Sequence, residues 1–138
     1  MLHDIAKPLT HCAVGEIGRL LASAEMLKRG IGVSKTELDC GVDLISHYGR
    51  VTKLIQVKTK GCSTYGTTKN TETFKIYRRS QTYEGCNLDA FVFVSLVTGT
   101  FYVVPCSAID LAKTSITIWR NSEWREAWHL LKVGERHA

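Results

Sequence analysis

The chain of 138 residues carries 18 lysines and arginines against 13 aspartates and glutamates, a formal net charge of +5, and 44% of its residues are hydrophobic. This length suits one domain with its own core, and the composition excludes a disordered chain, so we expect a single domain over residues 1–138. The longest apolar run, 90–97, is too short to cross a membrane, and residues 1–10 contain no apolar signal segment. We therefore expect a cytoplasmic, intracellular protein without a membrane partner.

The five cysteines are widely spread and form no Cys-x-x-Cys pair. An odd number without close spacing is typical of reduced thiols in a cytosol and argues against a disulfide framework. His11 and Cys12 are adjacent, and neighbours in sequence seldom ligate one ion well. We therefore expect no zinc site.

The first predicted element is an amphipathic helix. Apolar residues recur every three or four positions over 12–29, and Gly30 follows as a typical C-terminal signal. Glu16 falls at the margin of the apolar stripe, where a glutamate is ordinarily a surface residue. If the helix packs across the strands that follow it, Glu16 points along the sheet toward Asp43.

A β-hairpin is predicted between residues 41 and 61. Apolar runs over 42–45 and 51–57 flank a turn at Gly49, whose glycine allows the positive φ of a tight connection. A short edge strand over 31–37 precedes the hairpin.

Polar residues interrupt this hairpin at three places. Asp43 stands in the first strand, and Gln56 and Lys58 stand near the end of the second, where a buried strand ordinarily carries Val or Ile. Because side chains alternate along a strand, Gln56 and Lys58 project to one face while Ile55 and Val57 project to the other. The hairpin thus brings an acid, an amide oxygen and an ammonium group together. Taken singly, each residue also fits an edge strand or a solvated face.

The middle of the chain predicts a loop and a second hairpin. Residues 62–73 are rich in small polar types without periodicity, and 73–83 fit either a strand or a short helix. Apolar, β-branched and aromatic residues over 88–97 and 100–105 predict a mostly buried hairpin.

The C-terminal part predicts a helical turn over 107–112, a brief strand over 116–119 and a helix over 122–131, with Ser122 as its N-cap. The complete order is α-β-β-β-β-β-α, an α/β fold in which helices flank a mixed sheet. Three tryptophans fall close together here, and we expect them in the core or at an oligomer interface. They are Trp119, Trp124 and Trp128.

Positive charge is concentrated after the first hairpin turn. Between residues 50 and 79 there are eight basic residues and one acidic residue, Glu72. Such a patch suits a phosphate backbone, because each cation that neutralises a phosphate releases counterions. The ordinary alternative is a solvated face. The residues expected to bind nucleic acid are Lys53, Lys60, Lys69, Lys75, Arg78 and Arg79.

A helix with Glu16, a strand with Asp43 and a strand that ends in Gln56-Val57-Lys58 together resemble the PD-(D/E)xK nuclease superfamily. The resemblance is to its archaeal-type Holliday junction resolvases and small group I intron homing endonucleases. It implies a restriction-endonuclease-like fold. Glu16 resembles the family's N-terminal acid, Asp43 its metal-binding aspartate, and Gln56-Val57-Lys58 the (D/E)xK half-motif.

The resemblance also implies a function, namely a metal-dependent endonuclease that hydrolyses DNA phosphodiester bonds, with junction or branched DNA as a candidate substrate. Asp43, the Gln56 oxygen and the Val57 carbonyl would hold Mg²⁺ or Mn²⁺, with Glu16 ligating through water. Lys58 would orient the attacking water and stabilise negative charge on the phosphate. Gln56 replaces the family's second acid, and its amide oxygen adds no negative charge. Small members act as homodimers or higher homo-oligomers.

Two other functions stay open from the sequence alone. One is a catalytically decayed nuclease-fold protein that binds nucleic acid, in which Gln56 marks the lost site. The other is a protein-interaction domain that uses its Trp-rich C-terminus. Metal binding separates the nuclease from both, and the salt dependence of DNA binding separates these two from each other.

Overall fold

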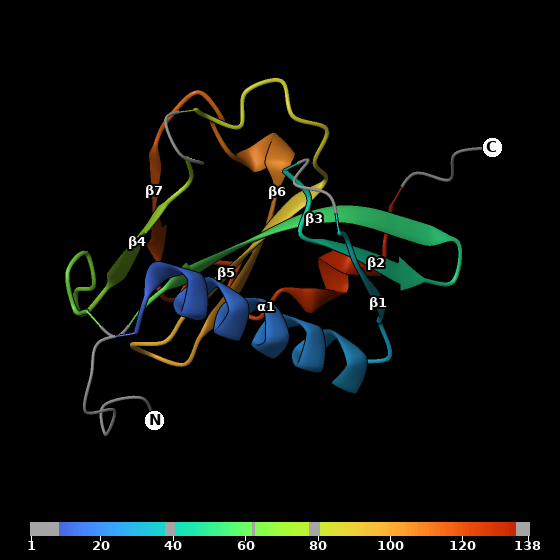
Figure 1. Cartoon of the computed structure of the whole chain (residues 1–138), viewed down its shortest axis with the longest axis horizontal. Coiled ribbons are helices and arrows are strands. Elements are labelled where there is room, and N and C mark those ends of the chain that lie inside the picture. The colour runs from blue at the N-terminus through green and yellow to red at the C-terminus, as the bar shows by residue number, and fades with distance from the viewer. Residues whose placement is uncertain (1–8, 38–40, 62, 78–80, 135–138) are drawn as a thin grey trace.

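The computed structural model of the protein describes residues 9–37, 41–61, 63–77 and 81–134. In these ranges one α-helix is followed by seven strands, five of which form a mixed sheet in the order β1-β2-β3-β5-β6, while β4 and β7 pair separately (Figure 1). The elements are α1 (His11–Lys28), β1 (Gly32–Lys35), β2 (Leu44–Tyr48), β3 (Val51–Lys60), β4 (Thr71–Lys75), β5 (Ala90–Ser95), β6 (Phe101–Pro105) and β7 (Ser115–Trp119).

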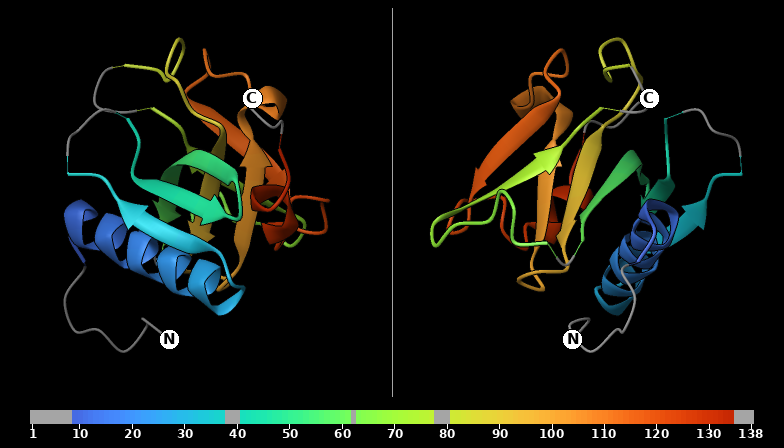
Figure 2. Two further views of the ribbon diagram at one scale, coloured as in Figure 1. Left: turned by 90° about the vertical axis from the view of Figure 1, so that its right-hand side faces the viewer. Right: turned by 60° about the vertical axis from the view of Figure 1, so that its left-hand side comes forward.

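Helix α1 covers one face of the five-stranded sheet (Figure 2), as the apolar periodicity predicts. Thr10 caps it by accepting a hydrogen bond of 3.1 Å from a backbone N–H of the first turn. Ala22 and Met26 are fully buried against the sheet. At Gly18 the helix passes so close to Thr59 of β3 that a Cβ would overlap that side chain. The glycine therefore sets the distance between helix and sheet.

Both predicted hairpins are present. Strands β2 and β3 pair antiparallel around Gly49, whose φ is 59°, and β5 and β6 pair antiparallel beside them. Strands β3 and β5 run parallel and join the two hairpins into one sheet. All six residues of β5 are buried, which accounts for its continuous apolar run. Strand β1 forms the sheet edge, as predicted.

The two faces of the sheet carry separate cores. Ile55 and Val57 of β3 contribute to the core beneath α1. Phe91 and Phe93 of β5 contribute to the other, which the β4–β7 pair covers, with the rings of Phe74 and Phe93 5.0 Å apart. The second face is thus covered by two strands and not by a helix.

The prediction of a helix over 122–131 is wrong. The described chain turns there and forms only a short 3-10 segment, Trp128–Leu131. Glu126 has a φ of 51°, which a right-handed helix does not contain. Its carboxylate accepts a 2.8 Å hydrogen bond from the Trp128 indole, and that ring is buried against Phe101 at 5.4 Å. Tertiary packing of Trp128 therefore overrides the local helical spacing.

Three further outcomes concern the middle and end of the chain. The ambiguous stretch 73–83 contributes to a strand, β4, which already begins at Thr71 and pairs with β7. The predicted turn over 107–112 is a 3-10 turn at Cys106–Ala108. No helix among the described residues combines the length and apolarity that a membrane crossing demands.

Candidate active site

Asp43 lies immediately before β2, not inside it as predicted. Its backbone N–H donates to the Ile55 carbonyl at 2.8 Å, and its Oδ2 accepts from the Val57 N–H at 3.1 Å. The N–H and C=O of one residue in a strand face the same neighbour, so the Val57 carbonyl is also turned toward Asp43. Because β2 begins only at Leu44, the Val57 N–H donates to the Asp43 side chain and not to a backbone carbonyl of β2.

The backbone around Asp43 is held from the other side by Thr36. Its hydroxyl donates to the Val42 carbonyl, and its N–H donates to the Asp43 carbonyl at 3.3 Å. Nothing in the sequence around Thr36 indicates this role, because the contact depends on the chain returning from β1 to β2.

Gln56 is nearly buried, with 8% of its surface exposed, and faces away from α1 on the side of its register partner Phe91. Its Nε2 lies 3.5 Å from the Val57 carbonyl, and its Oε1 has no hydrogen-bond partner among the described residues. Leaving a buried acceptor unpaired costs about 1–3 kcal/mol. An oxygen of this kind is well suited to receive a ligand.

Lys58 lies on the same face, two residues along β3 and therefore about 7 Å from Gln56 along the strand. Its Nζ donates to the Tyr77 carbonyl at 3.1 Å and lies 4.8 Å from the centre of the Tyr83 ring. Tyr77 and Tyr83 thus hold the ammonium group, and neither was predicted from the sequence.

Glu16 approaches the same end of the sheet from α1. Its carboxylate pairs with Arg19 on the helix and with Lys35 Nζ of β1 at 3.6 Å. Lys35 is the register partner of Leu44, the residue after Asp43. The structure therefore gathers Asp43, Gln56, Val57 and Lys58 on the β2–β3 hairpin and ties Glu16 to two neighbouring cations.

The donor set fits a hard divalent cation. It consists of one carboxylate, one backbone carbonyl and one buried amide oxygen, the oxygen ligands that Mg²⁺ and Mn²⁺ accept. Within the described ranges no group of three or more His, Cys, Asp or Glu residues could hold a metal. A cation here would therefore depend on the neutral oxygens of Gln56 and Val57 as well as on Asp43.

Two of the predicted DNA-binding lysines are engaged within the protein. Lys60 Nζ donates to Thr67 Oγ1 at 2.7 Å and lies 5.5 Å from the Phe74 ring centre. Burial lowers the pKa of Lys60, and the nearby Glu72 carboxylate opposes this effect. Lys53 lies on the opposite face of β3 from Lys58, with its Nζ against the backbone at residue 134. These contacts favour packing roles for both side chains.

Lys69 and Lys75 are exposed at the tip and on the outer side of β4. The Nζ of Lys75 lies 6.0 Å from the ring centre of Tyr77. Arg78 and Arg79 lie outside the described residues.

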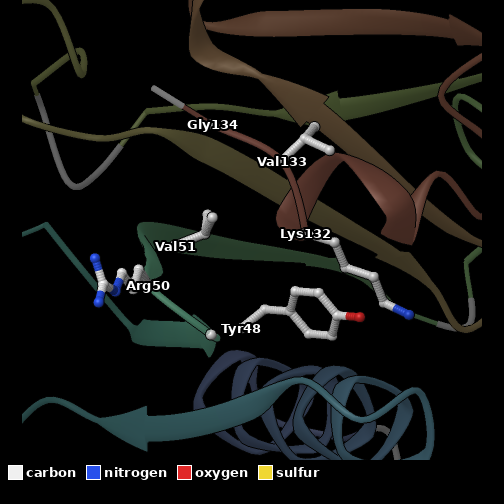
Figure 3. Close-up of a pocket in the computed structure, with 7 residues that line it drawn as sticks. Tyr48, Arg50, Val51, Lys132, Val133 and Gly134 are labelled. Carbon is white, nitrogen blue, oxygen red and sulfur yellow. The ribbon is translucent and has the colours of Figure 1, made fainter. Parts of the chain in front are cut away.

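A pocket of about 430 Å³ lies at the other end of the hairpin, between its turn and the C-terminal segment (Figure 3). The side chains of Tyr48 and Lys132 approach each other there, with Lys132 Nζ 5.0 Å from the ring centre. Strand β2 separates this pocket from Asp43, so it is not part of the candidate active site. Its lining also includes Arg50, Val51 and Val133.

No protein-family model and no curated protein sequence matches this chain. Among solved structures, the bacterial homing endonuclease I-Ssp6803I matches with a TM-score of 0.71 and 26% identity, over 89% of this chain and 91% of that one. The chain has the PD-(D/E)xK nuclease fold. Hjc, a Holliday junction resolvase from the archaeal hyperthermophile Archaeoglobus fulgidus, matches with a TM-score of 0.50 and 13% identity, over 85% and 88% of the two chains. These matches confirm the superfamily resemblance and the fold class predicted from the sequence.

In the PD-(D/E)xK nuclease fold of this chain, Gln56, Val57 and Lys58 lie on β3, the central strand of the five-stranded sheet (Figure 1). The first of these structures is named as a homing endonuclease and the second as a Holliday junction resolvase. The fold and the oxygen donors on the hairpin therefore point to the same chemistry.

Proposed function

We propose that this protein is an endonuclease that uses Mg²⁺ or Mn²⁺ to hydrolyse DNA phosphodiester bonds. The observation that carries the proposal is the buried, unpartnered Oε1 of Gln56, the residue that precedes Val57, whose N–H donates to the Asp43 carboxylate. Lys58 supplies a cation on the same face. The similarity to the homing endonuclease I-Ssp6803I supports the reaction class.

In this function Asp43, the Val57 carbonyl and Gln56 Oε1 would hold the metal ion. A divalent ion there would supply Lewis-acid chemistry for the phosphate and a water of lowered pKa. The Val57 N–H fixes the orientation of the Asp43 carboxylate through the 3.1 Å hydrogen bond. Lys58 stabilises the negative charge that develops on the phosphate, and Tyr77 keeps its ammonium group in place. Glu16 adds a further carboxylate at this end of the sheet.

The test is cleavage of linear duplex, four-way junction and single-stranded DNA with Mg²⁺ or Mn²⁺. We expect cleavage by the unsubstituted protein, with junction DNA among its substrates, and a rate loss of about 100-fold or more in Asp43→Ala and Lys58→Ala. Asp110→Ala and Lys113→Ala, which change the same residue types on an exposed turn, serve as controls and retain activity. Failure to cut any substrate, or full activity in both site variants, would refute the proposal.

A further inference from the structure

Strands β4 and β7 form a two-stranded antiparallel ribbon that stands apart from α1, on the other side of the main sheet (Figure 2). Along β4, Glu72 and Phe74 are buried, so Thr71, Thr73 and Lys75 face outward. The register with β7 places a partner opposite each of them. The outward residues, called the ribbon face below, are Thr71, Thr73, Lys75, Ser115, Thr117 and Trp119.

The inner side of the ribbon anchors it to the main sheet. The Glu72 carboxylate is fully buried and accepts hydrogen bonds from Ser95 at 2.5 Å, Thr98 at 3.1 Å and Tyr102 at 2.7 Å. Phe74 packs into the aromatic core beneath. A buried charge that is fully hydrogen-bonded fixes the position of its strand, because any displacement would leave it unpaired. The ribbon is therefore a rigid platform.

The tip of the ribbon is ordered as well. Arg120 Nη1 donates to the Thr68 carbonyl at 3.1 Å, and Thr68 Oγ1 accepts from the Thr71 N–H at 2.9 Å. The same tip carries the exposed Lys69 and Tyr65, the latter 88% exposed.

The ribbon face has the chemistry of a surface for a polyanion with hydrogen-bonding edges. It presents four hydroxyl groups, one ammonium group and one indole, and no carboxylate. Trp119 is 65% exposed, although burial of such a ring is favourable. The hydroxyls of Thr73 and Thr117 are 3.0 Å apart and set across the two strands.

We propose that the ribbon face enters the major groove of duplex DNA and reads base edges there. The inference rests on the proposed nuclease function and names the element that selects its substrate sequence. The major groove admits a two-stranded ribbon, Ser and Thr hydroxyls bond to any base edge, and lysine bonds to guanine O6 and N7. Lys75 and the paired hydroxyls of Thr73 and Thr117 are the reading residues, and Lys69 contacts the backbone beside them.

The candidate active site lies at one end of this ribbon. Tyr77, two residues beyond the end of β4, accepts the hydrogen bond from Lys58. At about 3.3 Å per residue, the stretch from Tyr77 back to Thr71 spans about 20 Å. With base pairs about 3.4 Å apart, the selected bases lie within about six base pairs of the cleaved bond.

The experiment uses protein carrying Asp43→Asn, which keeps an acceptor for the Val57 N–H, so that binding is measured without cutting. Duplex oligonucleotides with a randomised central segment are bound, recovered and sequenced. We expect a preferred sequence of about four to six base pairs. Adding Thr73→Ala with Thr117→Ala should lower the preference over a scrambled duplex about ten-fold or more. Thr52→Ala, an exposed threonine at the hairpin end of β3, should leave it unchanged.

A second experiment tests whether the ribbon face reads the bases in the major groove. Deazapurines placed in the DNA lack the N7 acceptor and so change only the major-groove edge. They should weaken binding by the Asp43→Asn protein. They should have little further effect on the protein that also carries Thr73→Ala and Thr117→Ala. No preferred sequence, a preference that survives the ribbon substitutions, or equal weakening of both proteins would overturn the proposal.

Cleavage by the protein with Asp43 intact separates the two proposals. Cutting of duplex DNA without any base preference overturns ribbon reading and leaves the nuclease function intact. A protein that selects sequence through the ribbon but cuts no DNA overturns the nuclease function alone.

Discussion

Gln56 is the residue at which this site departs from the acid that its superfamily leads one to expect. Alternation along β3 predicted its face correctly, because that depends only on neighbours in the chain. Its burial and its unpartnered Oε1 arise from the parallel pairing of β3 with β5, which local pattern does not reveal. A neutral oxygen in this place avoids a buried charge when no metal ion is bound.

Gln56→Glu should therefore have two opposite effects. The added charge should tighten Mn²⁺ binding about ten-fold or more, because affinity rises with ligand charge. The same carboxylate should destabilise the metal-free protein by about 1–3 kcal/mol, since it is buried without a partner. Isothermal titration and urea unfolding measure the two effects, with Gln81→Glu on the surface as the control. Unchanged metal affinity together with unchanged stability would count against the proposed ligand.

Cys106 should be slow to react with iodoacetamide. Burial, with smaller contributions from Asp89 and Cys86, raises the pKa of its thiol to about 12, and only the thiolate reacts. Cys12 is exposed and should be alkylated first at pH 8, with Cys106 following as the pH rises. Mass spectrometry of the treated protein measures both. The pKa of this thiol is about 12 in the folded protein and 9.0 ordinarily. Its contribution to the stability of the fold is therefore fully present below pH 9 and is lost as the pH rises toward 12. Equal labelling of the two cysteines at pH 8 would contradict the burial.

At the scale of elements, the sequence predicted those whose signal is local. The helix over 11–28 follows from its periodicity, and the β2–β3 hairpin follows from alternation and the turn at Gly49. The same reasoning gave a wrong prediction for residues 122–131. The spacing of their apolar residues is helical, but Trp128 packs into the main core and Glu126 adopts a positive φ.

The contact between α1 and β3 can be tested with two glycines of the same helix. Gly18→Ala places a methyl group on Thr59 and should destabilise the protein by about 1–3 kcal/mol. Gly15→Ala meets open space and should stabilise it by about 0.5–1 kcal/mol, because alanine favours the helix. Urea unfolding of both variants gives the comparison. Equal effects would mean that the helix does not approach the sheet at Gly18.

At the scale of the whole molecule, the outer side of α1 suggests how copies of the chain associate. Leu20 and Leu27 are each 61% exposed and, with the exposed Ala24 between them, form an apolar stripe at helical spacing. Such a stripe suits the homo-oligomer that the superfamily resemblance implies.

Leu20→Glu with Leu27→Glu should therefore convert the oligomer to a monomer, since the two charges would have to be buried in the interface. Sedimentation velocity measures the change in mass. Val133→Glu alters a residue of similar exposure, 59%, away from the helix and should leave the assembly intact. A monomeric unsubstituted protein, or an oligomer unaffected by the two glutamates, would exclude this interface.

By itself the sequence determined the helix, the two hairpins and the shared face of Gln56 and Lys58, because periodicity, glycine turns and side-chain alternation act over a few residues. Only the tertiary structure decided that β2 begins after Asp43, that Tyr77 holds Lys58 and that Glu72 is buried beneath a ribbon. Each of these depends on residues far apart in the chain that meet only when the sheet is assembled. The local sequence around Asp43, Tyr77 and Glu72 does not predict these long-range contacts.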